Sequence, residues 1–81
     1  MTSDVLSLIK MHTDAFSKRQ RAIAGFIMAN YDKAAFMTAS RLGKAINVSE
    51  STVVRFAAEL GYDGYPDMQR ALQEMIRNKL T

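Results

Sequence analysis

The chain has 81 residues, enough for one small domain, of which 48% are hydrophobic and 23% charged. Eleven basic and eight acidic residues give a net charge of +3, a mild attraction toward polyanions that does not by itself indicate nucleic-acid binding. The absence of cysteine excludes disulfides, thiolate metal sites and cysteine nucleophiles, and the single histidine, His12, is expected to be a packed or surface side chain.

Neither a membrane span nor a signal peptide is indicated. No run of 18 apolar residues occurs, and the N-terminal stretch carries Asp4 with no basic lead-in to an apolar segment. We therefore expect a cytoplasmic protein. Catalysis is not indicated either, since there is no His-Glu metal spacing and no glycine loop followed by Lys and Ser or Thr. We expect no catalytic residue, no cofactor and no metal site.

The first helix is expected to begin after Ser3 or Asp4, either of which can cap it. Its apolar positions follow the helical period loosely and end in an aromatic residue: Val5, Leu8, Ile9 and Phe16. A helix attached by so short a link must pack on the rest of the domain or on another copy of the chain. Both alternatives remain open.

The second helix is predicted to start at Ser17, with Gln20 completing a capping box. Its buried stripe comprises Ile23, Phe26 and Ile27. Three basic residues crowd its first turns, where they oppose the positive end of the helix dipole: Lys18, Arg19 and Arg21. A solvated helix face explains them more simply than phosphate contacts, and both interpretations remain open.

A single helical turn is expected next. Asp32 should cap residues 33–36, and Phe36 and Met37 are placed to fill the core. Thr38 then caps the first of two helices that form the central motif, residues 38–61.

The central motif has the spacing of a helix-turn-helix. Leu42 and Ile46 lie four apart on one helical face, while Val53 and Phe56 lie three apart on the next, so the two faces can close on each other. Gly43 leaves room for the two helices to approach.

The turn and the ends of the second helix are also marked. Asn47 suits a left-handed backbone better than any residue except glycine. Ser49 is a candidate N-cap, accepting from the N–H of Ser51 or Thr52, and Gly61 marks the end of the helix.

The last helix should follow a turn at Asp63-Gly64, with Pro66 at its first position and Asp67 near its positive end, and should run to about Lys79. Its apolar stripe comprises Tyr65, Met68, Leu72, Met75, Ile76 and Leu80. No strand is needed anywhere. The sequence therefore predicts a single domain over residues 1–81, an all-α bundle of five or six helices.

The stretch FMTASRLGKAINVSESTVVRFAAELGYDGYPDMQRAL resembles the N-terminal DNA-binding domain of the RpiR (MurR/RpiR) family of bacterial transcriptional regulators. The most specific parts are VSESTVVRF and LGYDGY, and SKRQRAIAGFIMANYDKAAFMT resembles the helices upstream. The resemblance covers about residues 14 to 78. It implies a homeodomain-like helix-turn-helix that regulates genes of sugar or amino-sugar metabolism. Such regulators usually continue into a sugar-phosphate-binding SIS domain, so the effector would act through a domain that these residues do not include.

The helix Ser49–Leu60 suits the DNA major groove, because small polar and basic side chains lie opposite its apolar stripe. Arg55 can contact guanine O6 and N7, Ser51 a base edge or phosphate, and Glu50 either cytosine N4 or only the helix's own first turn. The expected DNA-binding residues are Lys44, Ser49, Glu50, Ser51, Thr52 and Arg55. The alternative is a helical protein-interaction or dimerisation module without DNA binding.

A homodimer on double-stranded DNA is expected, since one recognition helix covers only a few base pairs. Two seams are possible. The preferred one is the first helix with Val5, Ile9 and Phe16, and the other is the end of the last helix, with Met75, Ile76 and Leu80.

Overall fold

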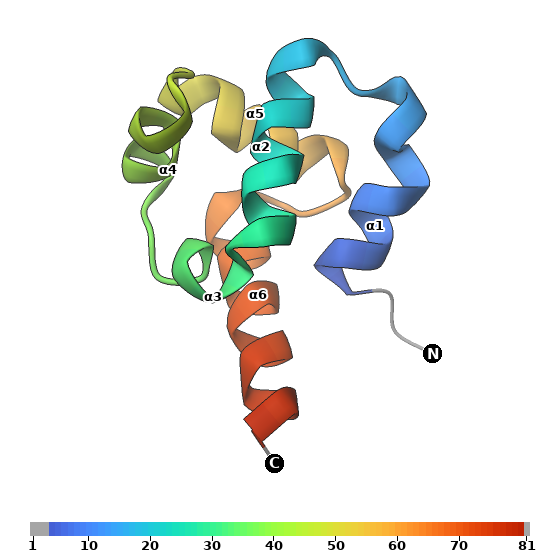
Figure 1. Ribbon diagram of the computed structural model, residues 1–81, viewed down its shortest axis with the longest axis vertical. Coiled ribbons are helices and arrows are strands. Elements are labelled where there is room, and N and C mark those ends of the chain that lie inside the picture. Colours follow the sequence, from blue (N-terminus) through green and yellow to red (C-terminus); the bar gives the residue numbers. More distant parts are fainter. Residues whose placement is uncertain (1–3, 81) are drawn as a thin grey trace.

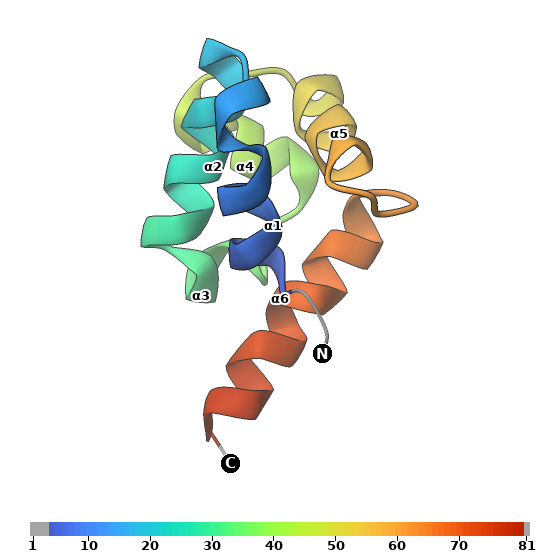
Figure 2. The same cartoon turned by 90° about the vertical axis from the view of Figure 1, so that its right-hand side faces the viewer.

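The computed structural model describes residues 4–80, with the side chain of Leu80 excepted. These residues form six α-helices, one 3₁₀ turn and no strand, as expected for the all-α class. The elements are α1 Val5–His12, η1 Thr13–Ala15, α2 Lys18–Ala29, α3 Tyr31–Ala34, α4 Ala39–Ile46, α5 Glu50–Glu59 and α6 Tyr65–Leu80. Figure 1 shows α1 and α4 on opposite sides of α2, with the C-terminal end of α6 projecting beyond the other helices, and Figure 2 shows the same projection from the side.

Side-chain caps fix the starts of four helices at the predicted residues. Asp4 Oδ1 accepts from the N–H of Ser7 at 2.8 Å at the start of α1, and Thr38 accepts from Arg41 N at 3.1 Å at the start of α4. Ser17 and Gln20 form the full capping box of α2. The fourth cap, at α5, belongs to the site below. Ser3, the other candidate cap of α1, lies outside the described residues.

The core draws on every long helix. The largest fully buried side chains are Phe56, Ile9, Ile23, Ile27, Leu42, Met68, Leu72, Val5 and Val53. The rings of Phe16 and Phe56 lie 5.2 Å apart, centroid to centroid, in a tilted arrangement of the kind that aromatic pairs favour. No polar or charged side chain is buried among the described residues. The helix-turn-helix therefore rests on an entirely apolar base.

The first helix packs on the bundle. It ends at His12, earlier than expected, and the 3₁₀ turn then carries the chain to Phe16. Val5, Ile9 and Phe16 are all buried within the domain. The apolar face proposed as the preferred dimer seam is thus already covered inside one chain, and that prediction is wrong.

The segment between α2 and α4 departs from the prediction. α3 begins at Tyr31, so Asp32 lies within its first turn and does not cap it. Phe36 is 70% exposed and does not fill the core. The reason is that both neighbouring carbonyls face α6: Ala35 O accepts from Gln73, and Met37 O accepts from Tyr65 and Gln69. Since the side chain of Ala35 is buried and that of Met37 packs against the core, Phe36 between them is left facing solvent.

The last helix begins at Tyr65, one residue before Pro66. Its first half is buried through Tyr65, Met68 and Leu72, whereas Met75 and Ile76 are only partly buried. Near its end, Lys79 Nζ lies 2.7 Å from Tyr31 Oη and so ties α6 to α3. None of the described helices has the length and apolar character needed to cross a bilayer.

Candidate nucleic-acid interface

The turn between α4 and α5 is tight because of two residues. Asn47 adopts a left-handed backbone, with φ 61° and ψ 45°, as the sequence predicted. The N–H of Val48 then donates to the carbonyl of Gly43 at 2.9 Å. A Cβ at Gly43 would lie 2.6 Å from the carbonyl oxygen of Val48, closer than real Cβ contacts come. Gly43 thus makes room for the backbone of the turn itself.

The start of α5 carries a cluster of three hydroxyls. Ser49 Oγ accepts from the N–H of Thr52 at 3.2 Å, the predicted N-cap. The same oxygen lies 2.7 Å from Thr52 Oγ1 and 3.1 Å from Ser51 Oγ. The hydroxyl of Thr52 is therefore held at the cap, whereas Ser51 is exposed and has its remaining hydrogen-bonding capacity available.

The end of α5 is equally defined. Gly61 has φ 104°, and the N–H of Tyr62 donates to the carbonyl of Ala57 at 3.1 Å, which is the Schellman arrangement. Gln20 Nε2 also donates to the carboxylate of Glu59, linking the start of α2 to the last turn of α5. Both ends of α5 are thus fixed relative to the bundle.

The two faces of α5 divide as predicted. Val53, Phe56 and Leu60 are buried. The opposite face is exposed and comprises Glu50, Ser51, Val54, Arg55 and Ala58. Arg55 is its only basic residue and is flanked by small or short side chains, so this face can approach a flat or grooved surface closely.

The six residues predicted to bind DNA lie on α4, the turn and the first half of α5. Lys44, Ser49, Glu50, Ser51 and Arg55 are exposed, while Thr52 is partly buried. Ser49, Ser51 and Thr52 come together at the cap. Lys44 lies on the preceding helix, and Arg55 lies on the outer face of α5, one turn beyond Ser51.

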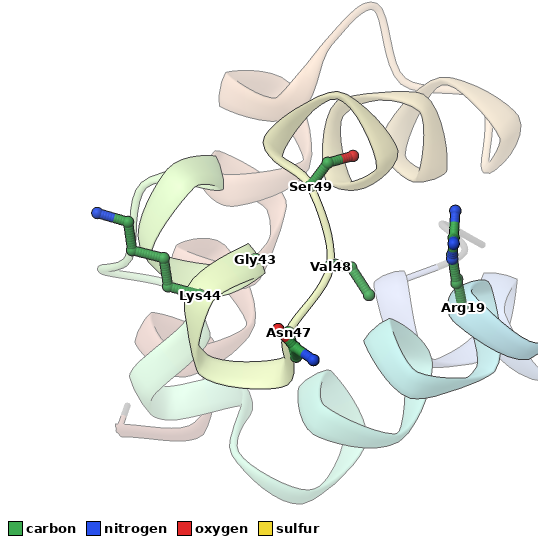
Figure 3. A pocket seen from close by; sticks show the side chains of 6 residues that line it. All are labelled: Arg19, Gly43, Lys44, Asn47, Val48 and Ser49. Atoms are coloured by element: carbon green, nitrogen blue, oxygen red, sulfur yellow. The ribbon is translucent and has the colours of Figure 1, made fainter.

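One residue near this site was not among those predicted. Arg19, at the start of α2, lines a cavity of about 350 Å³ together with Gly43, Lys44, Asn47, Val48 and Ser49. Figure 3 shows Arg19 beside the turn, with Lys44 extending on the other side of it. The signal in the sequence was the basic cluster in the first turns of α2, for which a solvated face was the simpler interpretation.

The positive charges are distributed unevenly. On α6, Arg70 and Arg77 form ion pairs with Asp67 and Glu74, and Lys79 lies over the ring of Tyr31. Within residues 4–80, the remaining basic side chains form no ion pair, hydrogen bond or cation–π contact. These are Lys10, Lys18, Arg19, Arg21, Lys33, Arg41, Lys44 and Arg55. Most of them lie on α2, α4 and α5, so the helix-turn-helix and its neighbour carry cations that can pair with an external anion.

Comparison with known proteins agrees with this geometry. Residues 3–79 match the helix-turn-helix domain of the rpiR family. The HTH-type transcriptional regulator HexR of Pseudomonas aeruginosa is 32% identical over 73 residues, which are 90% of this chain and 26% of HexR. The uncharacterised HTH-type transcriptional regulator YfhH of Escherichia coli is 28% identical over 71 residues, 88% of this chain and 25% of YfhH. The chain thus spans about a quarter of the length of these relatives.

The fold also matches a solved structure. The Vibrio vulnificus NanR protein complexed with ManNAc-6P has a TM-score of 0.85 and 32% identity to this chain, and the match covers 93% of this chain and 29% of NanR. The matching region therefore includes nearly all the helices described above. Together with the family match over residues 3–79, this establishes that the chain belongs to the rpiR family of helix-turn-helix domains.

Proposed function

We propose that this domain binds double-stranded DNA by placing α5 in the major groove, as the DNA-binding part of a transcriptional regulator. The observation that carries the proposal is the exposed face of α5, where Arg55 lies among small side chains on a helix fixed at both ends. A groove about 12 Å wide admits one such helix. Membership of a family of helix-turn-helix regulators supports the same assignment.

The side chains take different parts in this proposal. Arg55 contacts a guanine through O6 and N7, because its planar guanidinium can donate two parallel hydrogen bonds. Ser51 contacts a base edge or a phosphate. Lys44 and the capped start of α5 at Ser49 contact phosphates, which fix the position of the helix without reading sequence.

Two of the residues assigned to DNA binding, Thr52 and Glu50, are expected to contribute less to it. Thr52 contributes a methyl group and a hydroxyl already held by Ser49, so its contact to phosphate is secondary. Glu50 stands in the first turn of α5, where a carboxylate stabilises the helix dipole, and it can also accept from cytosine N4. A carboxylate near the backbone of DNA opposes binding, so Glu50 favours sequences that place a cytosine beside it.

The regulator to which this domain belongs is proposed to act on genes of sugar or amino-sugar metabolism. The support is that the NanR structure contains ManNAc-6P, a sugar phosphate. An effector of that class would bind outside these 81 residues, in a SIS-type domain, and would alter DNA binding through the rest of the chain. The regulator would act in the bacterial cytoplasm, since that compartment holds the chromosome. It would bind DNA as a homodimer.

Selection of bound duplexes from random DNA, followed by salt titration, tests the proposal. We expect log K to fall linearly with log salt on both selected and mixed sequences. Arg55→Ala should weaken binding to the selected duplex by about 1–3 kcal/mol and relax the preference at one base pair. Lys44→Ala should weaken binding to all sequences alike.

Two results would count against this assignment. Equal losses on selected and mixed DNA for both variants would mean that α5 is not the reading helix. No measurable affinity for any duplex at low salt would favour a protein-interaction module instead.

A further inference from the structure

We propose that the cavity between α2 and the helix-turn-helix turn is a binding site for a backbone phosphate of DNA, with Arg19 as its principal cation. This inference rests on the proposed function, since it names a further contact of the same interface. It adds a third element, α2, to a binding surface that the motif alone would limit to α4 and α5.

The cavity has the right composition for a phosphate. Its walls come from the start of α2, the end of α4 and the turn, and two of its six lining residues are cationic, Arg19 and Lys44. No acidic side chain lines it. Figure 3 shows these two residues on either side of the turn, with the hydroxyl of Ser49 above it. A phosphate entering from outside would therefore meet a guanidinium on one side and polar groups of the turn on the other.

Arg19 has no structural role that would account for its charge. It is exposed and makes no ion pair or hydrogen bond within residues 4–80. Its position in the first turn of α2 places a positive charge at the positive end of the helix dipole, which is unfavourable in the free domain. The neighbouring Gln20, not Arg19, makes the contact from α2 to Glu59 of α5. An external anion beside Arg19 would offset this unfavourable charge.

Arg19 holds the phosphate in the cavity, whereas Lys44, at the other edge of the cavity, contacts the next phosphate of the strand. They extend on opposite sides of the turn, and successive phosphates of one strand are several ångströms apart. Each neutralised phosphate contributes about 0.9 to the slope of log K against log salt on B-DNA. Arg19 therefore acts on affinity and on salt dependence, with no effect on sequence preference.

The test compares Arg19→Ala with Lys10→Ala in the 81-residue chain. Lys10 is an exposed cation on α1, on the opposite side of the domain from α4. Lys10→Ala therefore removes the same charge as Arg19→Ala, but away from the proposed site. For Arg19→Ala we expect the salt slope to fall by about 0.9, with equal fold-losses on selected and random duplexes. Arg19→Lys should restore the slope. Lys10→Ala should leave it unchanged.

Thermal melts without DNA separate this role from a structural one. Arg19→Ala is expected to melt no lower than the parent domain, because an unfavourable charge is removed. A lower melting temperature with an unchanged salt slope would show that Arg19 supports the fold, and would overturn the proposal. If the parent binds DNA with the expected salt dependence and Arg19→Ala keeps the full slope, only this inference fails. If the parent shows no affinity for any duplex, the proposed function fails first.

A free anion is the other source of the same chemistry. Inorganic phosphate titrated into the DNA-free domain should shift the amide resonances at residues 48–50 weakly, and a bound duplex should prevent those shifts. Shifts that disappear in Arg19→Ala but persist when a duplex is bound would assign the cavity to a small phosphorylated ligand, and would overturn its assignment to the DNA backbone.

Discussion

At Gly43 the fold admits no side chain, because the carbonyl of Val48 occupies the space where a Cβ would lie. Gly25, also within a helix, has open space around the same position. Helix propensity alone predicts that alanine stabilises both sites by about 0.5–1 kcal/mol. The structure predicts opposite outcomes, since the atom near Gly43 is backbone and cannot move without opening the turn.

We expect Gly43→Ala to destabilise the domain by about 1–3 kcal/mol, the usual cost of overpacking, and Gly25→Ala to stabilise it slightly. Urea unfolding of the two variants beside the parent provides the measurement. Equal effects of the two substitutions would mean that the turn lies farther from α4 than the structure places it.

Substitutions of Asn47 test the left-handed backbone of the turn. Asn47→Gly should be tolerated or mildly stabilising, because glycine has no Cβ to penalise this conformation. Asn47→Val should cost on the order of 1–2 kcal/mol. Thermal melts decide between these expectations, and a valine variant as stable as the parent would contradict the left-handed turn.

At the scale of the helices, the sequence predicted best what depends on neighbouring residues. Caps at Ser17, Thr38 and Ser49, and at Asp4 as one of two candidates, were identified because the accepting side chain and the N–H it bonds lie three residues apart. The exposure of Phe36 could not be predicted in the same way. It depends on Ala35 and Met37 facing α6, and residues 69–73 are more than thirty positions away along the chain.

These long-range contacts lead to a prediction at Tyr65. Its hydroxyl donates to the carbonyl of Met37 at 2.6 Å, and burial raises the pKa of Tyr65 above its ordinary value. Tyr65→Phe should therefore cost about 1 kcal/mol at neutral pH, the net value of one hydrogen bond.

The pH dependence follows from the direction of that pKa shift. The folded state favours the neutral phenol, so this contribution is fully present below the unfolded pKa near 10 and is lost as pH rises through the raised folded value. Denaturant unfolding at neutral and alkaline pH should show that Tyr65→Phe loses less unfolding free energy at alkaline pH than the parent does.

Tyr62→Phe is the control: burial also raises the pKa of Tyr62, but its hydroxyl makes no hydrogen bond within residues 4–80. A Tyr62→Phe variant as destabilised at neutral pH as Tyr65→Phe would contradict the role of the Met37 contact.

At the scale of the whole domain, the candidate site combines parts that differ in how far the sequence revealed them. The motif at residues 38–61 is continuous in the chain, so its faces followed from periodicity alone. Arg19 enters the site from α2, 24 or more residues before the other residues that line the cavity, and only the packing of α2 against α4 and α5 brings it there. Periodicity contains no information about that packing.

Assembly is also a property of the whole domain. In a two-fold dimer, the two recognition helices would have to stand about 34–36 Å apart to enter successive major grooves on one side of the duplex, and the operator would then be an inverted repeat of matching spacing. The longest dimension of the domain is 34 Å, which is close to that spacing. Because Val5, Ile9 and Phe16 are buried, we propose that the projecting end of α6 forms the seam, through the partly exposed Met75 and Ile76.

Sedimentation of the 81-residue chain over a range of concentrations tests this seam. We expect weak self-association that Ile76→Glu abolishes, because the carboxylate would be buried without a partner. Met11→Glu changes a 72% exposed methionine on α1 and should leave the association intact. Ile9→Glu cannot serve here, since Ile9 is buried and the variant would unfold. Association that persists in a folded Ile76→Glu variant would rule out the α6 seam, and a strict monomer at every concentration would place the dimer contact outside these 81 residues.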